Sequence, residues 1–329
     1  MAFRGLNYDV GAEMIAGRLS RPEFDETTAR AELAAIAGEL HCDAVRISGE
    51  DPARLASATR IAHELGLAVY FSPVRGNLRE ADALAYVAET AALAEELRSG
   101  GEVVFVVGLE ATLFQHGFFP GDTTLDRIRL AARPWRMFLG MLRTGDPQKR
   151  LNAYLAKAVA LTRERFGGSV TYASGSWERV DWTPFDVVGV NLYRSAKNRA
   201  KYRELLRDYQ RHGKPVVLTE FGCCTYRGAA DRGGLGWTAI DRSTTPARLA
   251  DGIVRDETEQ ADELTELLAI YRDEPVDGAF VFTWASYLYA WDDRPEHNLD
   301  TAGYGVVAVR PDGTWRPKEA YAVLASARV

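Results

Sequence analysis

Short runs of apolar, mostly β-branched residues recur along the chain and alternate with longer segments of mixed polarity. Runs of this length and composition, bounded by turn-forming residues, predict β-strands. They lack a strict apolar–polar alternation, which is typical of parallel strands covered on both faces. The predicted strands are 5–10, 44–48, 67–72, 102–108, 169–174, 187–193, 215–220 and 278–284.

Helical patterns lie between most of these strands, with apolar residues at spacings of three and four. The clearest begins after Asp51, which reads as an N-cap with Pro52 in the first helical position, and Gly66 reads as its stop signal. The segment between the fifth and sixth strands is short, so that crossover is the least defined. The other predicted helices lie within 24–40, 148–167, 245–273 and 317–328.

Eight strands separated by helices predict an α/β protein, a single (β/α)8 TIM barrel that spans residues 1–329. A length of 329 residues with 47% hydrophobic content suits one such domain. The alternative is a doubly wound open sheet, which calls for a glycine-rich phosphate loop after the first strand. The sequence NYDVGAEM at that point is not such a loop, and no GxGxxG or GxxxxGK[ST] motif occurs in the chain.

Composition narrows the range of partners. The formal net charge is -6 and the basic residues form no stripe, which argues against a nucleic-acid partner. The chain opens without a signal-peptide pattern and has no apolar run of the ~18 residues that a membrane span needs. Cys42, Cys223 and Cys224 are too few for a disulfide framework. We therefore expect a cytoplasmic protein with a soluble small-molecule substrate, with its oligomeric state left open.

Polar side chains gather at the carboxyl ends of the predicted strands, where the active sites of TIM barrels lie. Glu110 follows the fourth strand and Glu220 ends the seventh, and these two strands lie roughly across a barrel from each other. A carboxylate at the end of a buried strand is costly unless it is paired or used. The other candidates at strand ends are Asn7, Asp9, Arg46, Asn191, Tyr193 and Trp284.

A facing pair of glutamates suits glycosidic bond cleavage with retention, which needs two carboxyls about 5–5.5 Å apart. Arg46 and Tyr193 would keep Glu220 ionised as the nucleophile. Glu110 has more apolar neighbours and would keep its proton longer, as an acid must. Trp284 would offer a flat surface to a sugar ring or fill the core. Asn7 and Asp9 would line the pocket floor or cap the turn after the first strand.

Several stretches resemble a large clan of retaining glycoside hydrolases built on (β/α)8 barrels, whose catalytic glutamates lie on strands 4 and 7. VVLTEFG is similar to the nucleophile signature of that clan, VRIS to its strand 2 arginine motif and DVVGVNLY to its strand 6 segment. FVFTW resembles its strand 8 tryptophan motif, and AGYGVVAVRPDGTWRPKEAY its closing stretch. The resemblance implies a cofactor-free glycosidase with Glu220 as nucleophile and Glu110 as acid/base.

One position departs from this pattern. The clan has an asparagine before the strand 4 glutamate, where it binds the sugar 2-hydroxyl, whereas this chain has Leu109. The departure points to a modified sugar or to a reaction other than ordinary hydrolysis. More narrowly, RGLNYD, HCDAVRISG and FFPGDT resemble a bacterial group loosely labelled "abortive infection protein", a label that implies no particular chemistry.

Other features carry weaker predictions. The histidines show no HxH or HExxH spacing, which predicts no metal site. Cys223 and Cys224 read as small packing residues, and Glu178 as a solvated loop residue rather than a substrate contact. Long stretches without a strand pattern in a compact domain are usually functional or mobile. We interpret 111–148 and 222–244 as walls of a pocket.

Three hypotheses remain open from the sequence. The first is a retaining glycosidase that acts on a soluble glycoside. The second is a glycosidase-like barrel used in biosynthesis, by transglycosylation or by acid/base chemistry on a non-sugar metabolite; Leu109 motivates it. The third is a non-catalytic barrel that binds a sugar or a protein partner, and the pair of glutamates argues against it.

Overall fold

The computed structural model describes residues 1–13, 17–131 and 145–327 of the chain. Within them, eight parallel strands close into a barrel in the order β1-β10-β7-β6-β5-β4-β3-β2. The predicted (β/α)8 class is therefore confirmed, and the open doubly wound sheet is wrong. The barrel strands are β1 (Phe3–Gly11), β2 (Ala44–Gly49), β3 (Ala68–Pro73), β4 (Val103–Leu109), β5 (Ser169–Gly175), β6 (Val188–Asn191), β7 (Val216–Phe221) and β10 (Gly278–Val281).

The helices mostly follow the predicted spacing. Asp51 caps α2, accepting from the backbone of Ala53 and Arg54, and Gly66 follows its end with φ 78°. The sequence between β5 and β6 forms turns rather than a helix. The helices are α1 (Glu26–Gly38), α2 (Pro52–Glu64), α3 (Glu80–Leu97), α4 (Ala111–Phe114), α5 (Thr124–Ala131), α7 (Pro147–Arg163), α8 (Tyr202–Asp208), α9 (Ala229–Arg232), α10 (Glu257–Asp273) and α11 (Glu319–Ser326).

The helix predicted within 245–273 is wrong in its first part. Residues 245–256 form no helix; they contain the short strand β9 (Arg248–Leu249), which pairs with β8 (Ile240–Asp241). The helix α10 begins only after Asp256, whose carboxylate accepts from the Glu259 backbone N–H. Gly252, with φ 81°, interrupts any helix upstream of this cap.

The two long stretches predicted as pocket walls hold short elements. The first contains α4 and α5, and its residues 132–144 lie outside the described part of the chain. The second contains α9, the 3₁₀ helix η3 (Gly233–Ala239) and β8. Their role as pocket walls stays a prediction.

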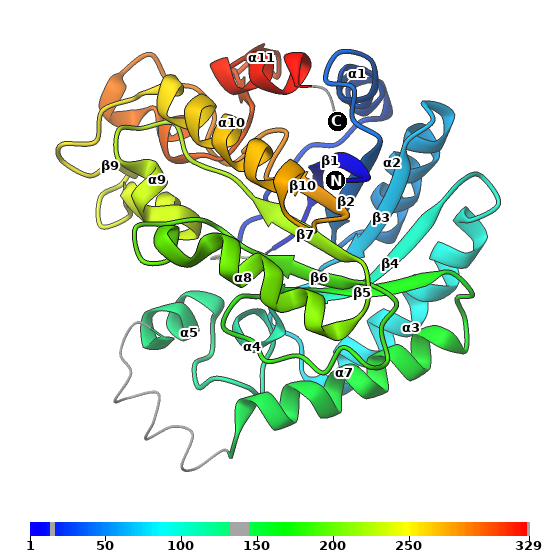
Figure 1. Cartoon of the computed structure of the whole chain (residues 1–329). Helices are drawn as coiled ribbons and strands as arrows, with labels where there is room; N and C mark the ends of the chain where they lie inside the picture. Colours follow the sequence, from blue (N-terminus) through cyan, green and yellow to red (C-terminus); the bar gives the residue numbers. More distant parts are fainter. Residues whose placement is uncertain (14–16, 132–144, 328–329) are drawn as a thin grey trace. The chain divides into compact units, whose positions relative to one another are not determined.

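The chain divides into two compact units. Unit 1 comprises Met1–Asp9, Ala34–Val45 and Leu192–Val329, and unit 2 comprises Val10–Leu33 and Arg46–Asn191. In unit 2 the helices α3 and α7 lie side by side, and in unit 1 α10 packs along α11 (Figure 1). The prediction of one domain over 1–329 stays a prediction.

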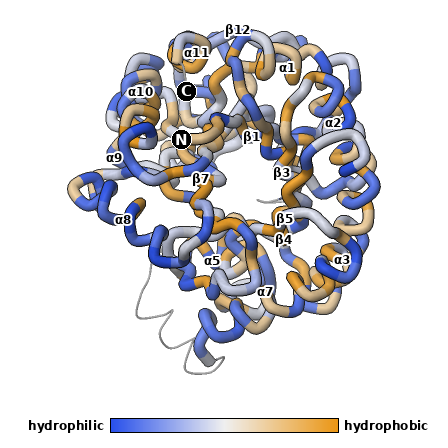
Figure 2. The backbone as a smooth tube through the Cα atoms, turned by 45° about the vertical axis from the view of Figure 1, so that its right-hand side comes forward, coloured by the Kyte–Doolittle hydropathy of each residue, from blue (hydrophilic) through white to orange (hydrophobic). Residues whose placement is uncertain are grey.

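Apolar burial stabilises the strands. The side chains of β3 and β4 are almost all buried, and Figure 2 shows both strands mainly in the hydrophobic colour. Each fully buried Val, Leu or Phe contributes about 1.5–3 kcal/mol. Among the described residues, no helix has both the length and the apolar content for crossing a bilayer.

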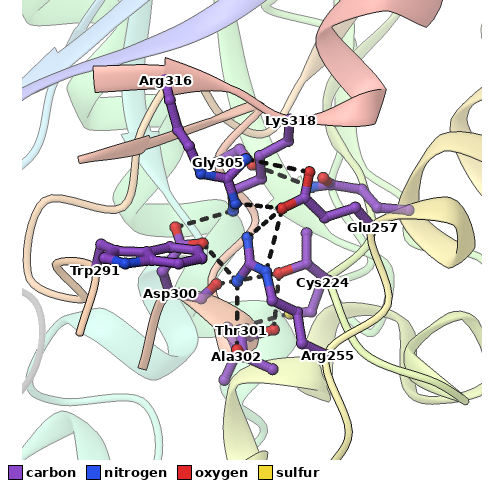
Figure 3. Close-up of polar contacts among 12 residues, drawn as sticks. Cys224, Arg255, Glu257, Trp291, Asp300, Thr301, Ala302, Gly305, Arg316 and Lys318 are labelled. Atoms are coloured by element: carbon purple, nitrogen blue, oxygen red, sulfur yellow. Dashed lines mark hydrogen bonds and ion pairs between the residues drawn. The ribbon is translucent and has the colours of Figure 1, made fainter. Parts of the chain in front are cut away.

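A cluster of charged side chains in unit 1 joins segments near the C-terminus of the chain (Figure 3). The Lys318 ammonium lies 2.9 Å from one oxygen of Asp300, and the Arg255 guanidinium lies 2.9 Å from the other. Glu257 accepts hydrogen bonds from both Arg255 and Arg316. The cluster joins the start of α10 to the antiparallel pair of β11 (Val307–Val309) and β12 (Trp315–Pro317) and to α11. Removing one partner of such a buried pair costs about 3–5 kcal/mol.

Candidate active site

Glu110 occupies an unusual backbone position in unit 2. The register between β4 and β5 shifts between Val106 and Leu109, and Glu110 follows in the left-handed region with φ 38° and ψ 49°. Its backbone N–H donates to the Ala173 carbonyl at 2.9 Å. Bulges are common beside active sites because they re-aim a side chain, and a left-handed conformation for a residue other than glycine persists only where its surroundings impose it. The register shift and the contact to Ala173 thus fix the turn on which Glu110 lies.

Asn191 meets the Glu110 carboxyl. Its side-chain amide at the end of β6 donates to Glu110 Oε1 at 2.9 Å, and Asn191 itself is buried. The clan's motif has an asparagine directly before this glutamate, and this chain has Leu109 at that position. The structure brings an asparagine to Glu110 from two strands away, a contact that no local motif predicts.

Arg46 lies buried in β2 of the same unit. Its Nε and Nη2 atoms donate to Ser72 Oγ on β3, at 3.3 and 3.1 Å. The Arg46 guanidinium therefore links β2 to β3.

Glu178 is wrongly predicted as a solvated residue. It is 8% exposed, and its carboxylate accepts from Thr112, Tyr172 and Gly175. Burial raises the pKa of Glu178, opposed by these hydrogen bonds. The burial of Glu178 was not predictable from the sequence, because its hydrogen-bond partners Thr112 and Tyr172 lie on other elements. A carboxylate between the tryptophan and the valine of SWERV was the available signal.

Glu220 lies in unit 1 near the end of β7, where every residue is buried. The Tyr193 hydroxyl donates to Glu220 Oε2 at 3.0 Å, and the Leu192 N–H donates to the Glu220 carbonyl at 3.0 Å. The structure thus brings together two residues that the sequence interpretation paired. A hydroxyl donor stabilises the ionised form of a carboxylate.

Aromatic rings hold Tyr193 in place. Its ring meets Phe282 and Tyr304 edge to face, with centroids 6.4 and 5.6 Å away. The Tyr304 hydroxyl donates to the Gly233 carbonyl and accepts from the Gly236 N–H, which ties down the segment that crosses the Tyr193 ring. Gly234 in that segment would bring a β-carbon within 3.1 Å of the Tyr193 ring.

Asn7 and Asp9 lie on β1. The Asn7 amide donates to the carbonyl of Thr219 on β7 at 3.0 Å, and more weakly to those of Phe280 and Val281 on β10. Asn7 therefore joins the ends of strands β7 and β10 directly beside Glu220. Asp9 is partly exposed at its strand position.

Trp284 is packed as core. It is 0% exposed, and its ring meets Trp315 and Tyr321 edge to face at centroid distances of 5.0 and 6.3 Å. A ring without exposed surface offers no face to a sugar. Trp284 therefore fills the core and does not act as a flat surface for a sugar ring.

The remaining candidates concern metals and thiols. Within the described ranges, no group of His, Cys, Asp or Glu side chains is arranged to hold a metal ion. Cys223 and Cys224 are buried free thiols, and burial raises the pKa of each above its usual value. Thiols of this kind act as packing residues rather than nucleophiles.

Solved structures share this fold. A GH113 β-1,4-mannanase matches with TM-score 0.66 and 16% identity over 99% of this chain and 98% of the other. The GH113 β-mannanase AaManA from Alicyclobacillus acidocaldarius matches with TM-score 0.62 and 20% identity, covering 98% and 96%. A β-glucuronidase from an uncultured Clostridium sp. matches over 98% of this chain and 50% of its own, with TM-score 0.60 and 15% identity.

No protein-family model and no curated protein sequence matches the chain. At identities this low the structural likeness shows the fold alone, a (β/α)8 barrel. The narrower resemblance to the "abortive infection protein" group is not shown by these comparisons.

Proposed function

We propose that the chain is a retaining glycoside hydrolase, acting as one barrel domain over residues 1–329, with Glu220 as nucleophile and Glu110 as acid/base. The observation that carries the proposal is the buried Glu220 at the end of β7 with the Tyr193 hydroxyl on its carboxylate. This arrangement occurs in a fold shared with solved glycoside hydrolases. A buried carboxylate at the end of a barrel strand, with a hydroxyl donor on it, suits attack on an anomeric carbon.

The reaction runs in two steps. In the first, a Glu220 oxygen bonds to the anomeric carbon while the bond to the leaving oxygen breaks, and Glu110 gives its proton to that oxygen. In the second, the ionised Glu110 takes a proton from water, the water oxygen bonds to the anomeric carbon, and the Glu220 ester bond breaks. The hydrogen bonds from Asn191 to the Glu110 carboxyl and from Tyr193 to the Glu220 carboxylate support these roles.

The substrate class follows from two arguments. The neighbours that match over nearly their whole length are described as GH113 β-mannanases and as a β-glucosidase, so β-linked mannosides and glucosides are the first substrates to assay. Leu109 precedes Glu110 and supplies no hydrogen bond to a sugar hydroxyl. We therefore expect the enzyme to tolerate changes at the sugar 2-position.

Trapping of the glycosyl-enzyme tests the proposal. The protein is incubated with 2-deoxy-2-fluoro β-mannoside, β-glucoside and β-glucuronide reagents that carry activated leaving groups, and the digested protein is analysed by mass spectrometry. We expect a label on the peptide that contains Glu220, and none in a Glu220→Gln variant. A label on a peptide without Glu220, or glycoside hydrolysis with no trapped sugar on any reagent, would contradict the assignment.

Leu109 also supports a second candidate, a barrel that transfers a sugar to an acceptor or acts on a non-sugar metabolite. Product analysis with an added acceptor alcohol separates hydrolysis from transfer. Turnover of a metabolite in the absence of any glycosidase activity favours the second candidate. A binding-only barrel is favoured if Glu110→Gln and Glu220→Gln variants keep full biological activity.

A further inference from the structure

The turn that carries Glu110 is held by a buried network on β5 and the turn after it. Glu178 Oε1 accepts from the Thr112 backbone N–H at 3.0 Å and from the Thr112 hydroxyl at 2.7 Å. Its Oε2 accepts from the Tyr172 hydroxyl at 2.8 Å and from the Gly175 N–H at 3.2 Å. All four donors are neutral, so the network fixes position without bringing a cation to the turn.

Tyr172 links this network to the residue next to Glu110. Its hydroxyl accepts the Ala111 N–H at 2.6 Å while it donates to Glu178. Burial, reinforced by the negative charge of Glu178, raises the pKa of Tyr172 well above its usual value, so the hydroxyl keeps the proton that it donates. The two residues that follow Glu110 are thus both hydrogen-bonded to this pair.

The backbone of Glu110 shows why such support is needed. A left-handed conformation costs a residue other than glycine on the order of 1–3 kcal/mol, and it persists only where the surroundings impose it. The α4 helix that follows has only four residues and is too short to impose it alone. The contacts to Tyr172, Ala173 and Glu178 supply the constraint from β5 and its turn.

We propose that Glu178 and Tyr172 are positioning residues that hold Glu110 in the left-handed turn from which it transfers its proton. This inference rests on the proposed function, because it takes Glu110 as the acid/base. It adds that the acid is aimed by a second, buried carboxylate that touches no substrate. Misplacing a catalytic group by about 1 Å can cost about 100-fold in rate.

Glu178→Gln and Tyr172→Phe test the proposal, because the first turns an acceptor oxygen into an amide donor, the second removes the hydroxyl, and both change little volume. Two control variants change buried groups of unit 2 elsewhere. Glu32→Gln alters a buried carboxylate that pairs with Arg21 at 2.9 Å, and Tyr86→Phe removes a hydroxyl that donates to the Glu50 carbonyl at 3.0 Å. All four variants are compared with the wild-type protein for thermal stability, which identifies any that fail to fold.

The first readout needs no substrate. Hydrogen exchange measured by mass spectrometry on the peptide 108–115 follows the amides of Ala111 and Thr112 directly. We expect exchange in this peptide to rise at least about tenfold in Glu178→Gln and Tyr172→Phe and to stay at the wild-type rate in the controls. Unchanged exchange in both test variants would overturn the proposal whatever the activity.

The second readout separates aiming from general damage. An activated aryl glycoside loses its leaving group without a proton, whereas a disaccharide needs one from the acid. We expect kcat/KM of the test variants to fall at least about tenfold more on the disaccharide than on the aryl glycoside, and the controls to keep the wild-type ratio. An unchanged ratio, where Glu110→Gln does change it, would overturn the positioning role. If Glu110→Gln itself leaves the ratio unchanged, the acid/base assignment fails and hydrogen exchange alone decides whether the turn is held by Glu178.

Discussion

Glu110 and Glu220 are held in different ways. Glu220 lies within strand β7, where the register against β10 also shifts between Leu218 and Phe221, and the Tyr193 hydroxyl donates to its carboxylate. Glu110 lies beyond a register shift in β4, in a left-handed turn, and its position follows from side chains of β5, β6 and the turn after β5. A carboxylate on a strand is aimed by the barrel itself. A carboxylate on a turn depends on a few specific contacts, and single substitutions should displace it more easily.

The largest effect is expected at Glu220. Glu220→Gln removes the proposed nucleophile, so turnover should fall by on the order of 10⁴-fold or more on every glycoside, with activated and unactivated leaving groups affected alike. Steady-state kinetics on an aryl glycoside and a disaccharide measure this. A variant that retains more than a few per cent of activity on either substrate would show that Glu220 is not the nucleophile.

Glu110→Gln should affect activated and unactivated leaving groups unequally. Loss of a general acid costs about 10²–10⁴-fold where the leaving group needs a proton, so the disaccharide should suffer that loss. The first step on an activated aryl glycoside should change far less, which pre-steady-state release of the phenol measures. Equal losses on both substrates would show that Glu110 acts on something other than the leaving group.

Glu257 in unit 1 provides a contrast in stability, because its contacts involve neither Glu110 nor Glu220. Burial opposes its ionisation, but hydrogen bonds from Arg316 and Arg255 outweigh it and lower the pKa of Glu257 from 4.5 to about 2. A depressed carboxyl pKa stabilises the fold above the unfolded pKa, and this stability is lost as the pH falls from about 4.5 to about 2. The contribution amounts to about 3 kcal/mol.

Urea unfolding of the wild-type protein and of Glu257→Gln across this pH range measures the effect. The difference in the free energy of unfolding between the two proteins should shrink by about 3 kcal/mol toward pH 2. The ratio of disaccharide to aryl glycoside activity should stay at its wild-type value at neutral pH. A difference that does not vary with pH would contradict the ion-pair account of Glu257.

The smallest effects are expected at the residues that donate to the two glutamates. Tyr193→Phe removes the hydroxyl from Glu220, and a hydrogen bond to a charged group contributes about 1.5–3 kcal/mol, so kcat/KM should fall about tenfold to 100-fold on both substrates. Asn191→Ala removes the amide from Glu110 and should affect the disaccharide more. Tyr86→Phe, whose buried hydroxyl donates to the Glu50 carbonyl, is the control. If Tyr193→Phe and Asn191→Ala lost activity on the disaccharide and the aryl glycoside in the same proportion, the separate roles proposed for Glu220 and Glu110 would be contradicted.

The same contrast explains what could be predicted from the sequence. The barrel strands were predictable because their buried Val, Ile and Phe residues form continuous apolar runs. Glu220 was readable because VVLTEFG has the apolar pattern of a strand that leads into a carboxylate, and Tyr193 because it closely follows the end of the neighbouring strand β6. The start of α10 was misplaced because the cap at Asp256 was overlooked in a segment with helical periodicity.

Contacts between side chains that are distant in the sequence could not be predicted from it. Nothing local to Glu178 indicates that it accepts from Thr112 and Tyr172, because the sheet brings those residues together. Trp284 was ambiguous for the same reason, since its partners Trp315 and Tyr321 lie on later elements. Leu109 departs from the clan's pattern at the point where the β4 register shifts, and a shift of that kind is invisible in one sequence.

The stereochemistry of the first product tests the central claim most directly. Hydrolysis of a β-glycoside is followed by proton NMR from the first seconds, before the released sugar mutarotates. With Glu220 as nucleophile and Glu110 as acid/base, the account predicts that the β-anomer appears first, because two displacements at the anomeric carbon restore its configuration. Initial release of the α-anomer would contradict it, because inversion excludes a glycosyl-enzyme on Glu220.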